Sequence, residues 1–255
     1  MITNKTILIA GASSGIGRQV ALLLSHHNNR IIVSARRQGE LDQLKDEIIA
    51  NGSQAIAIPC DALSQQQALS CVEQAIEAFT TVDIALLNIG DGPAFNMSKV
   101  TVDEINHNHQ LNYGTQINFL VPLIAQMKQQ GHGLIAHTNS LAGFLGLPMQ
   151  GPYSAAKAAG RILMDSCRIE LKPFGLKFVS IYPGFVATER TKGDGIPSPF
   201  EISEVDAAKH VIRALEKEKA DYLFPFMTAS LIRLARILPK PLTNKLLAKA
   251  VPADY

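Results

Sequence analysis

Seven short apolar runs divide the chain, and longer segments whose apolar residues recur every three or four positions lie between them. A short run rich in β-branched residues is typical of a buried strand, and the longer period is typical of an amphipathic helix. The runs cover residues 6–10, 30–37, 55–60, 84–87, 133–140, 176–181 and 222–224. This alternation favours one doubly wound α/β domain of Rossmann type, with a seven-stranded parallel sheet and helices on both faces.

The segments between the runs predict the connecting helices. The clearest helical patterns lie at about 38–51, 63–79, 101–130, 153–172 and 204–218. Residues 189–203 are instead polar and rich in Gly and Pro, which predicts a mobile loop. The chain has no repeat and no linker, so residues 1–225 are expected to form one dinucleotide-binding and catalytic domain.

Residues 226–255 extend this domain and carry two further apolar stripes with helical spacing. Five cations make the segment basic: Arg233, Arg236, Lys240, Lys245 and Lys249. Two interpretations stay open. The two stripes can form a helical hairpin packed on the substrate pocket or on a neighbouring subunit. The first consists of Leu231, Leu234, Ala235 and Leu238, and the second of Leu242, Leu246, Leu247 and Ala250. Alternatively, the segment can lie on an anionic membrane surface as a monotopic anchor.

Composition narrows the class of protein. The chain has 255 residues, is 47% hydrophobic and carries a net charge of +2, which gives no argument for a nucleic-acid partner. Its three cysteines are widely spaced and include no CxxC, which is typical of reduced thiols in a cytosolic protein. His107 and His109 lie two apart and do not share a helical face, so no metal site is predicted. The chain shows neither a signal-peptide pattern nor an apolar run long enough to span a bilayer.

The first strand leads into a glycine-rich turn, Gly11-Ala12-Ser13-Ser14-Gly15-Ile16-Gly17, and then a helix. Such a turn lets backbone approach a phosphate, and the helix N-terminus offers free N–H groups, so a dinucleotide site is predicted. At the end of the second strand Ala35 stands where an acid would hold the ribose of NAD, and Arg36 and Arg37 follow. A guanidinium suits a phosphate, which favours NADP(H) over NAD(H).

Chemistry-bearing residues follow several later strands, at the sheet edge where ligands bind in such folds. Asp61 follows the third strand and can contact adenine or cap the next helix. Gly90 follows the fourth strand, and Ser140 falls at the C-terminal end of the fifth. Tyr153 and Lys157 are four residues apart, so they share a helical face. An ammonium beside a phenol favours the phenolate, which lets the tyrosine exchange a proton near neutral pH.

With these motifs in this order the chain resembles the short-chain dehydrogenase/reductase family over roughly residues 5–225. The resemblance rests on the Gly11–Gly17 turn, Asp61, Asn88-Ile89-Gly90, Ser140, Tyr153-x-x-x-Lys157, and Pro183-Gly184 with Thr188. It implies that Tyr153 is the general acid, that Lys157 strengthens its acidity and holds the nicotinamide ribose, and that Ser140 orients the substrate carbonyl. Asn112 would help to hold a water connecting Lys157 to solvent.

The resemblance also implies a set of cofactor contacts. Asp61 and Ala62 would contact adenine, Asn88 and Gly90 would line the ribose, and the end of the sixth strand would pack on the nicotinamide. The implied cofactor residues are Gly11, Ser13, Ser14, Gly15, Ile16, Gly17, Arg36, Arg37, Asp61, Ala62, Asn88, Gly90, Lys157, Pro183, Gly184, Val186 and Thr188.

The sequence departs from the family pattern at two places. The fourth strand ends in Leu87-Asn88-Ile89-Gly90 instead of Asn-Asn-Ala-Gly, which predicts a change in packing. The helix before the fifth strand has Asn112-Tyr113-Gly114 where the family has Asn-x-x-Gly. Either one residue is missing there or the helix is wound differently, so Asn112 is functional or bonds only locally.

The leading hypothesis is an NADPH-dependent carbonyl reductase that acts on a small apolar substrate. The alternatives are an oxidative alcohol or steroid dehydrogenase, which can use NAD, and a non-catalytic NADP(H) sensor or scaffold on the same fold. By analogy with the family, the helices that carry Asn112 and Tyr153 are expected to form a homodimer or homotetramer. The expected location is cytoplasmic, or peripheral to a membrane through the C-terminal extension.

Overall fold

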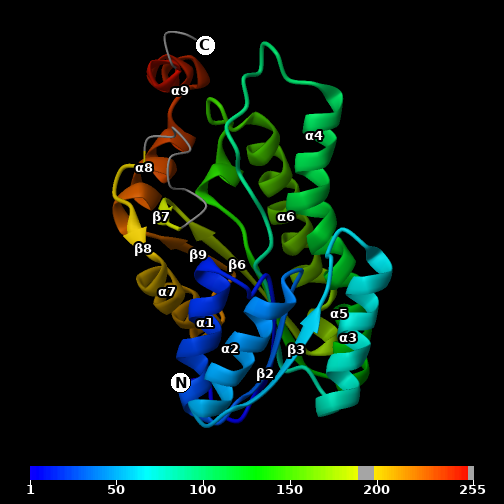
Figure 1. The fold of residues 1–255 in the computed structure, drawn as a ribbon. Helices are drawn as coiled ribbons and strands as arrows, with labels where there is room; N and C mark the ends of the chain where they lie inside the picture. Colours follow the sequence, from blue (N-terminus) through cyan, green and yellow to red (C-terminus); the bar gives the residue numbers. More distant parts are fainter. Residues whose placement is uncertain (189–197, 252–255) are drawn as a thin grey trace.

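The computed structural model describes residues 1–188 and 198–251. Its centre is a seven-stranded parallel sheet with the order β3-β2-β1-β4-β5-β6-β9 (Figure 1). The strands are β1 (Thr6–Ala10), β2 (Arg30–Ala35), β3 (Gln54–Pro59), β4 (Ile84–Leu87), β5 (Gly133–Thr138), β6 (Leu176–Pro183) and β9 (Asp221–Phe224). The chain order reverses between β1 and β4, which is where dinucleotides bind in folds of this class.

Helices cover both faces of the sheet. The first layer has α1 (Gly15–Leu24), α2 (Gln38–Ala50) and α7 (Glu204–Lys217), and the second has α3 (Gln65–Phe79), α4 (Val102–His109), α5 (Thr115–Gln130) and α6 (Gly151–Glu170). Alternate residues of β1 point to opposite layers: Ile7 and Ile9 pack with α1 and α7, and Leu8 with α3 and α5. Burial on both faces explains why every residue of this strand after Thr6 is apolar. The predicted doubly wound fold is therefore confirmed.

Several predicted boundaries shift by one or two residues. Strand β5 ends at Thr138, which leaves Asn139 and Ser140 beyond the sheet, and α6 ends at Glu170 instead of Lys172. Part of the predicted loop at 189–203 forms a strand, because β8 (Ile202–Ser203) pairs in parallel with β7 (Val186–Ala187). Residues 189–197 of that loop lie outside the described residues.

The long helical segment before β5 is not one regular helix. It begins with the predicted capping box, in which Thr101 and Glu104 bond to each other's backbone N–H. After α4 it passes through a π-helical segment (Gln110–Gly114) before continuing as α5. The helix is thus wound differently at Asn112, which was one of the two alternatives that the short Asn-x-Gly spacing had left open.

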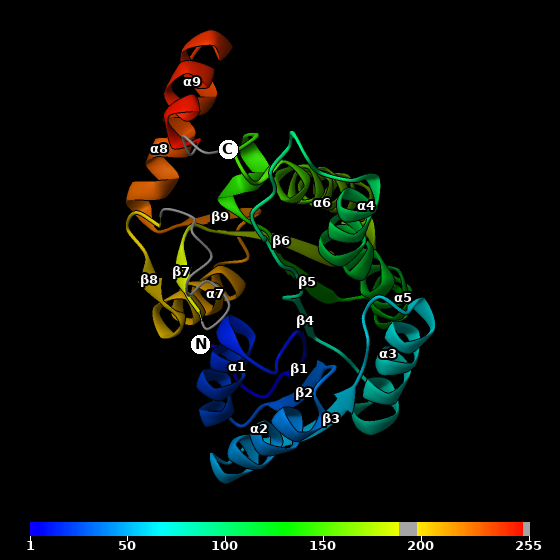
Figure 2. The same ribbon diagram turned by 45° about the horizontal axis from the view of Figure 1, so that its top comes forward.

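The C-terminal extension is helical. Helix α8 (Phe226–Ile237) packs against β9 and the 3-10 turn Leu141–Phe144, and α9 (Lys240–Leu247) continues outward into a 3-10 turn, Ala248–Ala250 (Figures 1 and 2). Shorter 3-10 turns follow α1 (Ser25–His27) and α6 (Lys172–Phe174). Among the described residues there is no helix with the length and hydrophobicity needed to cross a membrane.

Candidate active site

The glycine-rich turn joins β1 to α1 and brings the backbone of the two elements very close. Gly11 has φ +86°, and a side chain there would lie 2.5 Å from the backbone O of Asn88. At Gly17 a Cβ would overlap the carbonyl O of Gly11 and lie 2.9 Å from Asn88 Nδ2. Only glycine satisfies both approaches, so these two positions fix the path of the turn.

The same turn ends at the open N-terminus of α1. Ser14 is the N-cap residue but makes no side-chain cap bond, and the first turn of α1 holds no acidic residue. The backbone N–H groups and the positive end of the helix dipole are therefore directed at the space above the turn. These features fit the pyrophosphate of a dinucleotide.

Two arginines lie beside this turn, at the carboxyl end of β2. The guanidinium of Arg37 donates to Ser13 Oγ at 3.1 Å and to Ser13 O at 3.3 Å. Arg36 is exposed next to it. The guanidinium of Arg37 therefore contacts the glycine-rich turn.

Asp61 does not cap a helix. Its Oδ1 accepts a hydrogen bond from Leu63 N at 3.1 Å, which closes a local turn. The N-cap of α3 is Ser64, whose Oγ accepts from Gln67 N. The capping interpretation of Asp61 is therefore wrong, because the helix begins at Gln65, two residues later than predicted. Ala62 is buried, and its carbonyl O accepts from Asn118 Nδ2 at 2.9 Å.

The segment after β4 brings the two halves of the site together. Asn88 Nδ2 donates to Gly11 O at 3.4 Å, which links β4 to the glycine turn. Two residues further on, a Cβ on Gly90 would lie 2.6 Å from Asn112 Oδ1 and 2.9 Å from Lys157 Nζ. Gly90 therefore lets Asn112 and Lys157 approach the same stretch of backbone.

Asn112 lies inside the π-helical segment and is buried. Its Nδ2 donates to Asp91 O at 2.7 Å and to Asn108 O at 3.1 Å, and its Oδ1 accepts from Asp91 N at 3.0 Å. The side chain thus fixes the loop that follows β4. A π-helical segment also displaces backbone carbonyls from the regular helical ladder, and such segments are frequent at functional sites.

Tyr153 and Lys157 share one face of α6, as predicted. Lys157 Nζ lies 5.4 Å from the centre of the Tyr153 ring and donates to Thr138 O at 3.1 Å. Lys157 is 5% exposed, and this burial lowers its pKa to about 8. The amine is therefore still largely protonated at neutral pH and presents a desolvated cation to the tyrosine.

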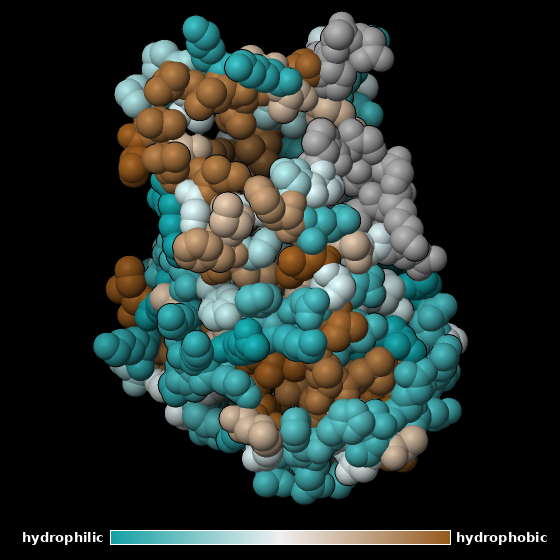
Figure 3. Space-filling model, turned by 90° about the vertical axis from the view of Figure 1, so that its left-hand side faces the viewer, coloured by the Kyte–Doolittle hydropathy of each residue, from teal (hydrophilic) through white to brown (hydrophobic). Residues whose placement is uncertain are grey.

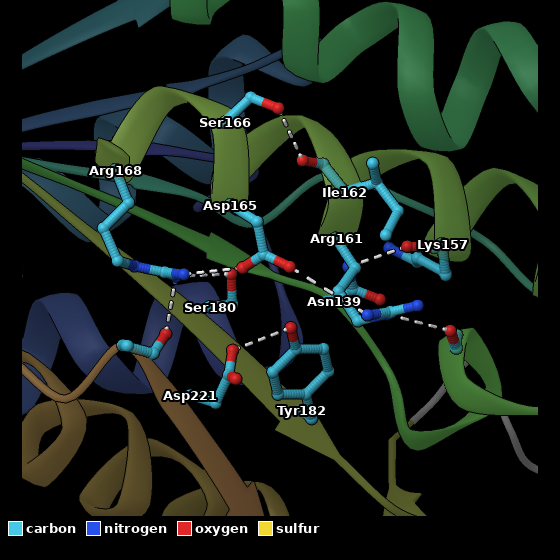
Figure 4. A network of polar contacts seen from close by, with 12 residues as sticks. Asn139, Lys157, Arg161, Ile162, Asp165, Ser166, Arg168, Ser180, Tyr182 and Asp221 are labelled. Carbon is cyan, nitrogen blue, oxygen red and sulfur yellow. Dashed lines mark hydrogen bonds and ion pairs between the residues drawn. The ribbon is translucent and has the colours of Figure 1, made fainter. Parts of the chain in front are cut away.

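Ser140 begins the 3-10 turn that packs on α6, and its Oγ accepts from Ala142 N at 3.1 Å. The residue before it, Asn139, ties this turn to α6. Asn139 Nδ2 donates to Lys157 O at 2.9 Å (Figure 4). Asn139 Oδ1 accepts from Ser140 N at 2.8 Å. Sequence analysis missed Asn139, because a lone asparagine before a serine has no distinguishing pattern.

The end of β6 completes this edge of the sheet. A Cβ on Gly184 would lie 3.1 Å from Pro225 Cδ and 3.2 Å from Thr228 Cβ, so Gly184 lets the start of α8 pack closely on the strand end after Pro183. Val186 is buried on β7. Thr188 lies near the glycine turn, since its Cγ2 would be 3.9 Å from a Cβ on Gly15. The segment expected to contact nicotinamide therefore lies beside the glycine-rich turn expected to bind the phosphates.

Behind the site, a partly buried polar network fixes α6 to β6 (Figure 4). Arg168 pairs with Asp165 at 2.6 Å and donates to Phe178 O, and His137 Nε2 is hydrogen-bonded to Ser180 Oγ at 2.9 Å. Burial, together with the charges of Lys157 and Arg168, lowers the pKa of His137 to about 3. His137 is therefore neutral at physiological pH and adds no charge near Lys157.

A small cavity of about 10 Å³ lies between this network and Asn112. It is lined by Leu87, Ile89, Asn112, Thr115, Gln116, Phe119, His137 and Thr138. Two of its polar atoms, Gln116 Nε2 and Thr138 Oγ1, are buried without a protein hydrogen-bond partner among the described residues. A cavity of this size and polarity is sufficient for one water molecule.

Comparison with known proteins places the chain among oxidoreductases. The family model described as short chain dehydrogenase matches residues 5–195. An uncharacterised oxidoreductase of Myxococcus xanthus is 31% identical over 94% of this chain and 95% of its own length. An L-rhamnose 1-dehydrogenase (NAD(P)+) of a Sphingomonas species is 32% identical over 76% of this chain and 77% of its own.

A solved structure has the same fold. A short-chain type dehydrogenase/reductase from Mycobacterium marinum superposes with a TM-score of 0.81 and 25% identity, covering 87% of this chain and 94% of that one. The match of the family model and the similarity over nearly the full length of a relative agree with the geometry of the site. The chain belongs to the short-chain dehydrogenase/reductase family and is an oxidoreductase that acts on CH–OH or C=O groups.

Proposed function

We propose that the protein is an NADPH-dependent oxidoreductase that moves a hydride between nicotinamide and the carbonyl or alcohol carbon of a small apolar substrate. The observation that carries this proposal is the pairing of Tyr153 with a buried, cationic Lys157 on one helical face, 5.4 Å from ring centre to Nζ. The open N-terminus of α1 lies at the same edge of the sheet and supports binding of the cofactor.

In this proposal the residues of the chain manage the oxygen of the substrate. NADPH, when bound, supplies the hydride. Ser140 orients the carbonyl, and Tyr153 donates its proton to the oxygen as negative charge develops there. Lys157 stabilises the resulting phenolate, since a desolvated ammonium interacts more strongly than a solvated one. In the oxidative direction the same groups act in reverse.

The proton that Tyr153 gives up must be replaced. We infer that Asn112 and the cavity beside it supply the route, through a water held near Lys157. Support comes from the π-helical winding at Asn112 and from the two orphan polar atoms of Gln116 and Thr138 in the cavity. A water between them would satisfy both groups.

The proposed preference for NADPH rests on Arg36 and Arg37. Arg37 already touches Ser13 in the nucleotide turn, and Ala35 offers no carboxylate to a ribose hydroxyl. The remaining proposed contacts are Asp61 and Ala62 for adenine, Asn88 and Gly90 for the ribose, and 183–188 for the nicotinamide end.

An oxidative dehydrogenase is the second candidate. It is favoured by the similarity to the L-rhamnose 1-dehydrogenase, which takes NAD(P)+. The two candidates share every catalytic residue and differ in the preferred cofactor and direction, so initial rates with NADPH plus a carbonyl panel, and with NAD+ plus the matching alcohols, distinguish them.

Replacing Tyr153 by Phe tests the mechanism. We expect kcat to fall by about 10³-fold, because the general acid is removed, while NADPH binds with an unchanged Kd. The matched control is Tyr222→Phe on β9, which removes a hydroxyl bonded to His210 of α7 and should leave kcat unchanged. Turnover of Tyr153→Phe at the wild-type rate would overturn the proposed mechanism.

We also propose that the subunits associate through α5 and α6 into a homodimer or homotetramer in the cytoplasm. Support comes from a groove of about 360 Å³ between these helices, lined by Val121, Ile124, Leu163, Ser166, Cys167, Glu170 and Leu171. Val121, which lines this groove, is itself 60% exposed. Association would cover this side chain. Size-exclusion chromatography with light scattering tests the assembly, and a monomer at micromolar concentration would contradict it.

A further inference from the structure

We propose that the C-terminal arm, residues 226–251, is a docking surface for an anionic membrane. The arm comprises α8, α9 and the following 3-10 turn. It is attached to the body by one face of α8 and presents its other face to solvent.

Helix α8 is amphipathic with its more apolar side outward. Its inner side carries Thr228 and Ala229, which are buried, and Ile232, which is half-buried against the body. Its outer side carries five exposed apolar residues within about 140° of the helix: Phe226, Met227, Leu231, Leu234 and Ile237. Phe226 and Ile237 are 75% and 79% exposed. Leu231 and Leu234 are each 52% exposed, which disfavours the interpretation in which their stripe packs on the substrate pocket.

Helix α9 extends the apolar surface. Thr243 is buried and its hydroxyl bonds to Ala235 O, which holds α9 against α8. Leu242 and Leu246, one turn apart, remain exposed on α9. In the space-filling view, hydrophobic residues gather over the end of the molecule that the arm forms (Figure 3). A patch of this kind needs a partner.

The positive charge of the arm favours an anionic partner. Five cations, Arg233, Arg236, Lys240, Lys245 and Lys249, lie in residues 226–251, and no Asp or Glu does. All five are exposed. The rest of the chain carries three more acidic than basic residues. An apolar helical face flanked only by cations matches a bilayer surface that contains anionic lipid.

The same charges disfavour a second copy of this chain. In a symmetric dimer the same patch is used on both subunits, so cations would face cations with no carboxylate to pair with them. A membrane instead supplies both an apolar layer for Phe226 and Ile237 and phosphates for the lysines.

Docking would also bring the 3-10 turn after Ser140 near the bilayer. The inner side of α8 packs against the 3-10 turn after Ser140, where Ala229 and Ile232 contact Leu141 and Phe144. The guanidinium of Arg236 lies 4.8 Å from the centre of the Phe144 ring. An apolar substrate dissolved in the membrane would therefore enter beside Ser140; this last step rests on the proposed function, whereas docking itself does not.

Vesicle binding of the full chain tests the proposal. Phosphatidylcholine vesicles with about one third phosphatidylglycerol should bind the protein at least about tenfold better than pure phosphatidylcholine, and salt should weaken the binding. Two variants should each lose about tenfold of this binding: Phe226→Ser with Ile237→Ser, and Lys240→Glu with Lys245→Glu.

The matched control is Ile169→Ser, which changes a comparably exposed isoleucine on α6, and it should bind vesicles like the wild type. Circular dichroism and the Kd for NADPH verify that each variant is folded, and these readouts do not depend on the identity of the substrate. Equal binding to neutral and anionic vesicles, or wild-type binding by both arm variants, would overturn the proposal. So would a loss of oligomers in the arm variants without a loss of vesicle binding, because the arm would then be a subunit interface.

Discussion

The glycine turn, Gly11–Gly17, and the proposed catalytic corner, which is the group of side chains around Tyr153 and Lys157, lie at the same edge of the sheet. Different interactions hold the two regions in place. In the turn, Gly11 and Gly17 allow backbone atoms to approach so closely that no side chain fits. In the corner, buried side chains bond to backbone: Asn139 to Lys157 O, Lys157 to Thr138 O, and Asn112 to both sides of Asp91. The turn is defined by steric exclusion and the corner by polar bonds.

Because of this difference, substitutions in the two regions should cause different defects. An added atom in the turn must displace backbone, so it should impair both folding and cofactor binding. A polar change in the corner leaves the packing intact and alters protonation or orientation, so it should appear in kcat and in pH dependence. Substitutions in the two regions can therefore be distinguished by what they leave unchanged.

The largest effect is expected from Gly17→Ala. Its Cβ would overlap the carbonyl O of Gly11, which belongs to backbone and cannot rotate away. We expect the free energy of unfolding to fall by about 3 kcal/mol, and the affinity for NADPH to fall at least about 100-fold because the phosphate turn is displaced. Urea unfolding and fluorescence titration with NADPH measure the two quantities.

Gly39→Ala is the control for this change. Gly39 lies in the first turn of α2, and an added Cβ would meet no atom within 4 Å. Alanine should stabilise the helix there by up to about 1 kcal/mol. If Gly17→Ala and Gly39→Ala behaved alike, the turn would not be defined by steric exclusion.

An effect of similar size, but with a pH signature, is expected at Lys157. Burial lowers its pKa from 10.5 to about 8 in the folded protein. Above pH 10.5 the amine is neutral in both states and burial has no electrostatic cost. Below pH 8 it is charged in both states, and the folded state bears the full cost of about 3 kcal/mol. The stability contributed by this group therefore rises with pH between 8 and 10.5.

Comparison of the wild type with Lys157→Met isolates this term. The Met variant should be stabilised relative to the wild type by about 3 kcal/mol more at pH 7.5 than at pH 10.5, since it has no charge to bury. Urea unfolding without cofactor at both pH values is the measurement. A difference between the two proteins that is the same at both pH values would mean that Lys157 is solvated, and the corner would lose its desolvated cation.

Sequence patterns predicted the framework of both regions, because each rests on local or periodic signals. Continuous apolar runs predicted strands buried on both faces, and the glycines of the turn stand between a strand and a helix. The proposed catalytic pair needed only the spacing of Tyr153 and Lys157 on one helix. Lys157 reaches the carboxyl end of β5 through its bond to Thr138 O, at the sheet edge where ligands bind in this fold.

What sequence patterns could not predict depends on contacts distant along the chain. The π-helical winding at Asn112 is held by Asp91, 21 residues away, and Asn139 matters because it reaches Lys157, 18 residues away. Asp61 and Ser64 are both good capping residues, and only the observed helix start distinguishes them. Likewise, the stripe on α8 was visible in the sequence, but the direction it faces is set by β9 and the Ser140 turn.

The smallest effect is expected at Arg37, which lies beside the glycine turn. Arg37 donates to Ser13 from an exposed position, so the contact that we propose for it with a 2′-phosphate would be partly screened by solvent. Arg37→Ala should lower the ratio of kcat/KM for NADPH over NADH by about tenfold, or about 1.4 kcal/mol. Because Arg37 contacts the turn and not the corner, the loss should appear in KM for NADPH while kcat and the NADH parameters stay constant. Arg30→Ala, at the opposite end of β2, is the control and should leave the ratio unchanged. A fall in kcat with both cofactors would instead mean that Arg37 acts on the corner, and binding and catalysis would not be separable along this edge.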